Sequence, residues 1–197
     1  MKQKRFLSKC ALTAAAVLVC GQFGFSQNTT SASSSDKKFV QSALEFGNAE
    51  VKLGQLAAQK GTSDDVKQFG QKMVDDHTKL GDQMKQIAQQ QGIDVPDGIP
   101  AKDKALETKL NSLSGDAFDK AYIKAMVKDH QKDLSEFKKE ASSGNDTSIK
   151  DAASQGAQVI SEHLQMAQQM AQKHSVETDA MSNDLSGQPV GHREHQQ

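Results

Sequence analysis

Apolar residues recur three or four positions apart along four long stretches of this chain, and this period constrains the fold more than any other feature. Such spacing places the apolar side chains on one face of an α-helix, which has to be buried against a partner. The second stretch shows it most clearly, with Val66, Phe69, Met73, Leu80, Met84 and Ile87. The sequence has no run that alternates with period two, as a β-strand would. The pattern therefore predicts an all-α protein.

Capping and helix-breaking residues divide the chain into four long helices and a short one. Asp36 is the expected cap of the first, glycines follow the first two at Gly61 and Gly92, and prolines exclude a helix between 93 and 100. Short links at 61–62 and 144–145 make two αα-hairpins, joined by the Pro-containing crossover and the short helix. Residues 36–174 are thus expected to form a four-helix bundle, with helices over about 36–60, 63–91, 102–112, 114–144 and 146–174.

The first 26 residues have the layout of a secretory signal peptide, with basic residues, a short apolar run and then small residues. The apolar run, 11–20, is shorter than the roughly 20 residues that span a bilayer. Cleavage after Ser26 predicts an exported protein, either periplasmic or associated with the outer membrane. A lipoprotein cut before Cys20 is the alternative, although Val19 is not the small residue usual there. The polar segments 27–35 and 175–197 are expected to be a disordered tether and tail.

Removal of the leader also changes the chemistry that is open to the chain. The two cysteines, Cys10 and Cys20, both lie in the leader, so a chain cut after Ser26 has no disulfide, no thiolate-bound metal and no cysteine nucleophile. The remaining 20 basic and 25 acidic residues give a net charge of −5. This charge argues against nucleic-acid binding. No segment after the leader has the apolar length of a transmembrane span.

One ionisable residue interrupts the apolar face of each long helix, and the four are Glu50, His77, His130 and His163. Burial of such groups costs several kcal/mol unless they are paired or bind a metal. If both hairpin turns lie at one end of the bundle, the three histidines fall within about 6 Å of one another along its axis. Glu50 then lies about one turn nearer that end, and Glu45 is the alternative carboxylate.

Three imidazoles and a carboxylate suit a single transition-metal ion such as zinc, iron, manganese or copper. Three acids, each next to a histidine in the sequence, are candidates to orient the imidazoles: Asp76, Asp129 and Glu162. Under the alternative interpretation, Glu50 pairs with a neighbouring histidine as a buried polar bridge without an ion. One observation separates the two, because imidazoles that share an ion have to lie within about 5 Å of one another.

The segments AEVKLGQLA, VKQFGQKMVDDH, GDAFDKAYIKAMVKDH and EHLQMAQ together resemble a bacterial envelope family, domain-of-unknown-function family 4142. Its members are often labelled "predicted outer membrane protein". The resemblance covers about residues 37–172 and implies a ferritin-like four-helix bundle. Ferritin-like di-iron enzymes usually carry Glu-x-x-His pairs on two helices. Here Val74, Val127 and Ile160 stand three residues before the histidines, so the bridging carboxylates of a di-iron site are missing.

Three functions follow from these observations. The first is an exported envelope bundle that binds a metal ion in its core, for metal binding or stress protection rather than catalysis. The second is a structural or interaction module of the envelope, which acts through a protein partner or as a homo-oligomer and binds no metal. The third, a ferritin-like redox enzyme, fits less well because the Glu-x-x-His pairs are absent.

Overall fold

A computed structural model describes residues 31–178 of the chain, and these residues form five α-helices. They are α1 (Ser34–Lys60), α2 (Asp64–Gln91), α3 (Ala101–Asn111), α4 (Gly115–Ser143) and α5 (Thr147–Lys173). The predicted all-α class is confirmed, and every helix boundary lies within two residues of its expected position. Among the helices of residues 31–178, none has the length and apolar character that crossing a membrane requires. The expected signal peptide, most of the tether and most of the tail lie outside the described residues.

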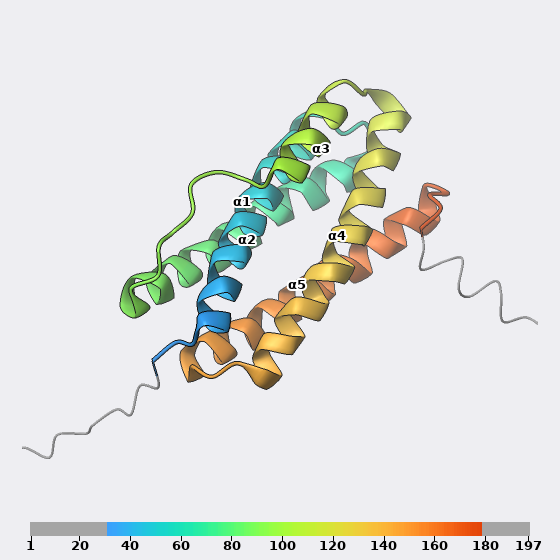
Figure 1. The fold of residues 1–197 in the computed structure, drawn as a ribbon. Helices are drawn as coiled ribbons and strands as arrows, with labels where there is room; N and C mark the ends of the chain where they lie inside the picture. The colour runs from blue at the N-terminus through green and yellow to red at the C-terminus, as the bar shows by residue number, and fades with distance from the viewer. Residues whose placement is uncertain (1–30, 179–197) are drawn as a thin grey trace, which may run out of the picture.

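The four long helices pack as two antiparallel hairpins, α1 with α2 and α4 with α5 (Figure 1). The crossover from 92 to 100 leads into α3, which packs on α1 and α4. Two buried apolar clusters fill the interior. One includes Phe69, Phe118 and Ile123, and the other includes Leu44, Ile149 and Ile160. In α2, α4 and α5 the predicted histidine lies between the residues of one cluster and those of the other.

The two hairpin turns lie at opposite ends of the bundle, so the assumption that they share one end is wrong. At one end the Asp36 carboxylate, on the first turn of α1, accepts hydrogen bonds from the backbone N–H of Asn145 and Asp146 in the α4–α5 turn. At the other end Asp119, near the start of α4, accepts from the backbone N–H of Thr62 in the α1–α2 turn, at 2.9 Å. The histidines still reach one level, because each lies near the middle of a helix of 27 to 29 residues.

The ends of the bundle extend further than the sequence predicts. Ser33, expected in the tether, is the N-cap of α1, and Asp36 is the third residue of the helix and completes a capping box with it. Ala32 is buried before this cap, and Val176 is buried after α5. The inner ends of the expected tether and tail therefore contribute to the packed domain.

A close approach of α1 and α2 fixes the first hairpin. A Cβ atom placed on Gly54 would lie 2.7 Å from the backbone oxygen of Gly70, and one on Gly70 would lie 2.7 Å from the backbone oxygen of Gly54. Real Cβ contacts are longer, so only glycine at both positions lets the two backbones come this close. Since Gly70 stands seven residues before His77, this contact helps to set the height and rotation of the α2 histidine.

Candidate metal centre

The structure brings together the three predicted histidines from three different helices. His77 comes from α2, His130 from α4 and His163 from α5, and one ring nitrogen of each lies within 4.8 Å of the other two. Their ring centroids are 5.2 to 5.7 Å apart. The nitrogen separations therefore fall within the limit of about 5 Å expected for imidazoles that share an ion. A tetrahedral ion with bonds of ~2.0–2.1 Å holds its ligand atoms about 3.4 Å apart, so small side-chain rotations would close the set.

Existing hydrogen bonds fix which nitrogen two of these histidines can offer. The Nδ1 of His130 lies 2.9 Å from the backbone oxygen of Met126, which can only accept, so Nδ1–H donates and Nε2 keeps its lone pair. The Nε2 of His163 lies 3.0 Å from the Oδ2 of Asp76, so Nε2–H donates to the carboxylate and Nδ1 keeps its lone pair. Hydrogen bonding of one ring nitrogen is how proteins usually set the tautomer of a metal-binding histidine.

One ring nitrogen of each of the three histidines is buried and unpartnered. The Nε2 of His77, the Nε2 of His130 and the Nδ1 of His163 have no hydrogen-bond partner among the described residues. Burial, together with the other nearby histidines, holds the pKa of His77 well below its usual range, and burial lowers the pKa of His130 to about 3. Burial also lowers the pKa of His163, although Asp76 works against it. The three rings are therefore neutral at pH 7, as ligands of a metal have to be.

Asp76 is the one predicted orienting acid that reaches a histidine in the described chain, and the histidine is not its sequence neighbour. It precedes His77 on α2 but accepts its hydrogen bond from His163 on α5. Lys72 also donates to it, at 2.8 Å. Burial acts to raise the pKa of Asp76, but the bonds from Lys72 and His163 outweigh it and lower the pKa. Asp76 is therefore a carboxylate that can strengthen His163 as a ligand.

The other two predicted orienting acids do not contact the histidines. Asp129 binds Lys102 of α3, at 3.3 Å, and Glu162 is exposed to solvent. Helix geometry explains why neither acid contacts the histidine next to it in the sequence, because adjacent residues on a helix point about 100° apart. An acid beside a histidine in the sequence therefore reaches its ring only exceptionally, and more readily reaches a ring on a neighbouring helix.

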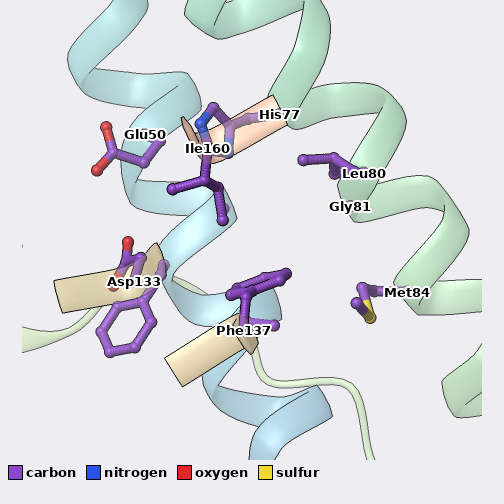
Figure 2. Close-up of a pocket in the computed structure, with 11 residues that line it drawn as sticks. Glu50, His77, Leu80, Gly81, Met84, Asp133, Phe137 and Ile160 are labelled. Carbon is purple, nitrogen blue, oxygen red and sulfur yellow. The ribbon is translucent and has the colours of Figure 1, made fainter. Parts of the chain in front are cut away.

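Glu50 is buried as expected, but it does not join the three nitrogens, since the described ligand cluster contains histidines alone. It lines a cavity of about 20 Å³ with His77 and Asp133, enclosed largely by apolar side chains (Figure 2). Burial, and then Asp129, Asp133 and Asp103, raise the pKa of Glu50 well above its usual range. Its Oε2 has no hydrogen-bond partner among the described residues. The alternative carboxylate, Glu45, is half-buried on α1 and is also outside the cluster.

Tyr122 and Asp133 are two buried polar residues near the centre that the sequence analysis did not single out. Tyr122 is completely buried, and its hydroxyl has no partner among residues 31–178. It stands eight residues before His130 on α4, and this spacing of two helical turns could have identified it. Asp133 stands three residues after His130, and burial raises its pKa to about 7. Both extend the polar region at the middle of the bundle.

Comparisons with known proteins support the fold and the family. A family model described as "Domain of unknown function (DUF4142)" matches residues 24–170, as the resemblance implied. No curated protein gives a significant match. A similar solved structure is the crystal structure of a DUF305 fragment from Deinococcus radiodurans, with a TM-score of 0.65 and 13% identity. The match covers 72% of this chain and 98% of the fragment. The fold of the fragment is all-helical and of the ferritin-like type.

Proposed function

The chain belongs to the DUF4142 family, and we propose that it binds one divalent transition-metal ion between His77, His130 and His163. The observation that carries this proposal is the set of three buried imidazole nitrogens without hydrogen-bond partners. Each buried, unpartnered polar atom costs about 1–3 kcal/mol of stability. A single ion would satisfy all three atoms at once, and it requires the neutral rings that burial already favours.

The donor set narrows the choice of ion. Three neutral imidazoles without a carboxylate suit zinc, copper, iron or nickel better than manganese, which prefers oxygen. Three protein ligands also leave a fourth position for water or another small ligand. A two-metal centre needs carboxylates that bridge the ions, and the described cluster offers none. The proposed role is therefore metal binding or protection against metal stress rather than di-iron oxidation.

The test is metal binding by the mature chain, purified without an affinity tag. We expect one Zn²⁺ or Cu²⁺ per chain by titration calorimetry, and a higher melting temperature in its presence. At a free ion concentration of 100 times Kd, the gain in stability is about 2.7 kcal/mol. A chain whose melting temperature ignores Zn²⁺, Cu²⁺, Mn²⁺ and Fe²⁺ would overturn the proposal.

A matched pair of variants separates the site from other histidines. His163→Leu should abolish the stoichiometric binding. His174→Leu should retain it, because His174 lies at the end of α5 and its Nε2 contacts Asp65, away from the cluster. Both variants should also carry His192→Ala and His195→Ala, which remove the histidines of the C-terminal segment as competing ligands.

Export into the cell envelope is the second part of the proposal. It rests on the signal-peptide layout of residues 1–26 and on the absence of cysteine from a chain cut after Ser26. Mass spectrometry of the protein recovered from a periplasmic extract should give an N-terminus at Gln27. An N-terminus at Cys20 that carries lipid would instead show a lipoprotein.

A further inference from the structure

A surface groove on the first hairpin has one of the three histidines of the candidate metal centre in its wall. It has a volume of about 380 Å³ and lies between α1, α2 and the end of the crossover loop. Asn48 and Lys52 of α1 line it together with Gly98 and Ile99 of the loop. On the α2 side its wall includes His77 and Gly81. The groove therefore brings solvent to the edge of one candidate ligand.

His77 is the histidine of the cluster that this groove reaches. Its residue surface is 6% exposed, against 1% for His130 and 0% for His163. Three further surface grooves on the described part of the chain include none of the three histidines in their walls. An ion that arrives through the groove would meet His77 before the other two histidines.

Gly81 borders the open space beside His77. It stands four residues after His77, one helical turn along α2, and lines both the groove and the small cavity that Glu50 also lines (Figure 2). A Cβ atom placed on Gly81 would meet no atom within 4 Å, so a larger side chain would extend into this space.

Two lysines border the groove and set the electrostatic conditions for entry. Lys85 forms an ion pair with Asp82 at 3.2 Å, whereas Lys52 is exposed and has no ion pair among the described residues. A positive charge at the entrance slows the approach of a cation, and salt weakens this effect. The charge of Lys52 therefore provides a handle on the entry rate that does not involve the ligands.

We propose that this groove is the entrance of the metal centre: a divalent transition-metal cation passes between Gly81 and α1, binds His77 first and then His130 and His163. This proposal rests on the proposed function, because it names the route to that site. It concerns the rates at which the ion loads and is released, which a measurement of equilibrium affinity does not test. Obstruction of the groove slows loading and release together, whereas loss of a ligand weakens binding.

The experiment is stopped-flow loading of the mature chain with Co²⁺, followed by the visible absorption of the bound ion. Gly81→Leu should slow loading by roughly tenfold or more, as expected when binding has to wait for a side chain to move. Release should slow by a similar factor, so Kd changes little. Gln86→Leu is the control, since Gln86 is exposed on the same helix and lines neither the groove nor the cavity. It should load at the wild-type rate.

Lys52→Glu provides a second, independent variant at an exposed position. It should load faster than wild type at low salt, and the difference should shrink at high salt. Lys124→Glu, on the exposed face of α4 and outside the groove, should leave the rate unchanged. If Gly81→Leu does not fold, Lys52→Glu decides the question.

The outcomes separate the two proposals. A wild-type chain that binds no ion overturns the proposed function and the entrance with it. A wild-type chain that binds one ion, while Gly81→Leu and Lys52→Glu load at the wild-type rate, overturns the entrance alone.

Discussion

Two regions of this bundle bury polar side chains, but only one of them supplies hydrogen-bond partners for all of the buried polar atoms that it holds at its centre. At one end the Asp36 clasp, made of Asp36, Ser33, Asn145 and Asp146, joins the start of α1 to the α4–α5 turn. Asp36 is completely buried, and its carboxylate accepts backbone hydrogen bonds from Ser33, Asn145 and Asp146 at 2.9 to 3.2 Å. At the middle of the bundle, the three histidines leave one nitrogen each without a partner.

The contrast separates a polar cluster that stabilises the fold from one that is open to a ligand. Burial acts to raise the pKa of Asp36, but backbone hydrogen bonds lower it to about 2. The clasp therefore contains a charged carboxylate that is stabilised by hydrogen bonds. The histidines are instead held neutral and incompletely bonded. Glu140 lies beside the clasp. Burial, together with the nearby Asp36, raises its pKa to about 7.

Removal of the Asp36 carboxylate should have the largest effect. Asp36→Ala removes the acceptor of three backbone N–H groups, one buried and two part-buried, and a buried group left without an acceptor costs about 1–3 kcal/mol. We expect a loss of about 4 kcal/mol in the free energy of unfolding, measured by urea denaturation at pH 7. Asp64→Ala is the control, since Asp64 also lies in the first turn of a helix but is exposed. A loss in Asp36→Ala no larger than in the control would mean that the clasp does not stabilise the fold.

Loss of the carboxylate that orients His163 should weaken metal binding without removing a ligand. Asp76→Asn keeps the size of the side chain but removes the charge that makes His163 a stronger donor. Such changes usually cost 10- to 100-fold in metal affinity, which is about 1.4–2.7 kcal/mol. Calorimetric titration with Zn²⁺ measures it, and Asp75→Asn is the control because Asp75 is exposed and bonds Gln71. Equal affinities in the two variants would show that Asp76 has no part in the site.

The sequence predicted the helices and the three histidines well because both depend on local periodicity. Helix boundaries follow from capping residues and glycines, and the face of each histidine follows from its place in an apolar stripe. The prediction of a common level succeeded for a different reason than the one given. The turns lie at opposite ends, and the histidines meet because each is near the middle of its helix.

The remaining parts of the site depend on contacts between helices, which periodicity does not contain. Asp36 reaches Asn145 across 109 positions in the sequence, and Asp76 reaches His163 across 87. Neither pairing can be inferred before the arrangement of the hairpins is known. Glu50 was predicted as a ligand because it interrupts a stripe as the histidines do. In the described structure its carboxylate lies outside the cluster of the three histidines, and burial beside other carboxylates raises its pKa.

Acid should weaken the clasp in a defined pH range. The pKa of Asp36 is about 2 in the folded chain, below the ordinary value of 3.8, so its charge stabilises the fold above pH 3.8 and this contribution is lost as the pH falls toward 2. The shift corresponds to about 2 kcal/mol. The difference in unfolding free energy between wild type and Asp36→Asn should shrink by that amount between pH 6 and pH 2. A difference that is independent of pH would show that the carboxylate is not charged in the fold.

The smallest effect should also be the most informative one, because its sign depends on the metal. In the metal-free chain, His130→Leu replaces a ring with an unpartnered nitrogen by an apolar side chain of similar size. The backbone oxygen of Met126 keeps its helical partner, since the N–H of residue 130 remains. We therefore expect the variant to be as stable as wild type or more stable by up to about 1 kcal/mol. With saturating Zn²⁺ the order should reverse, because only wild type gains the binding energy. Chemical denaturation with and without Zn²⁺ measures both signs. A metal-free variant that is several kcal/mol less stable than wild type would place the histidines with Asp36, as polar groups that the fold itself requires.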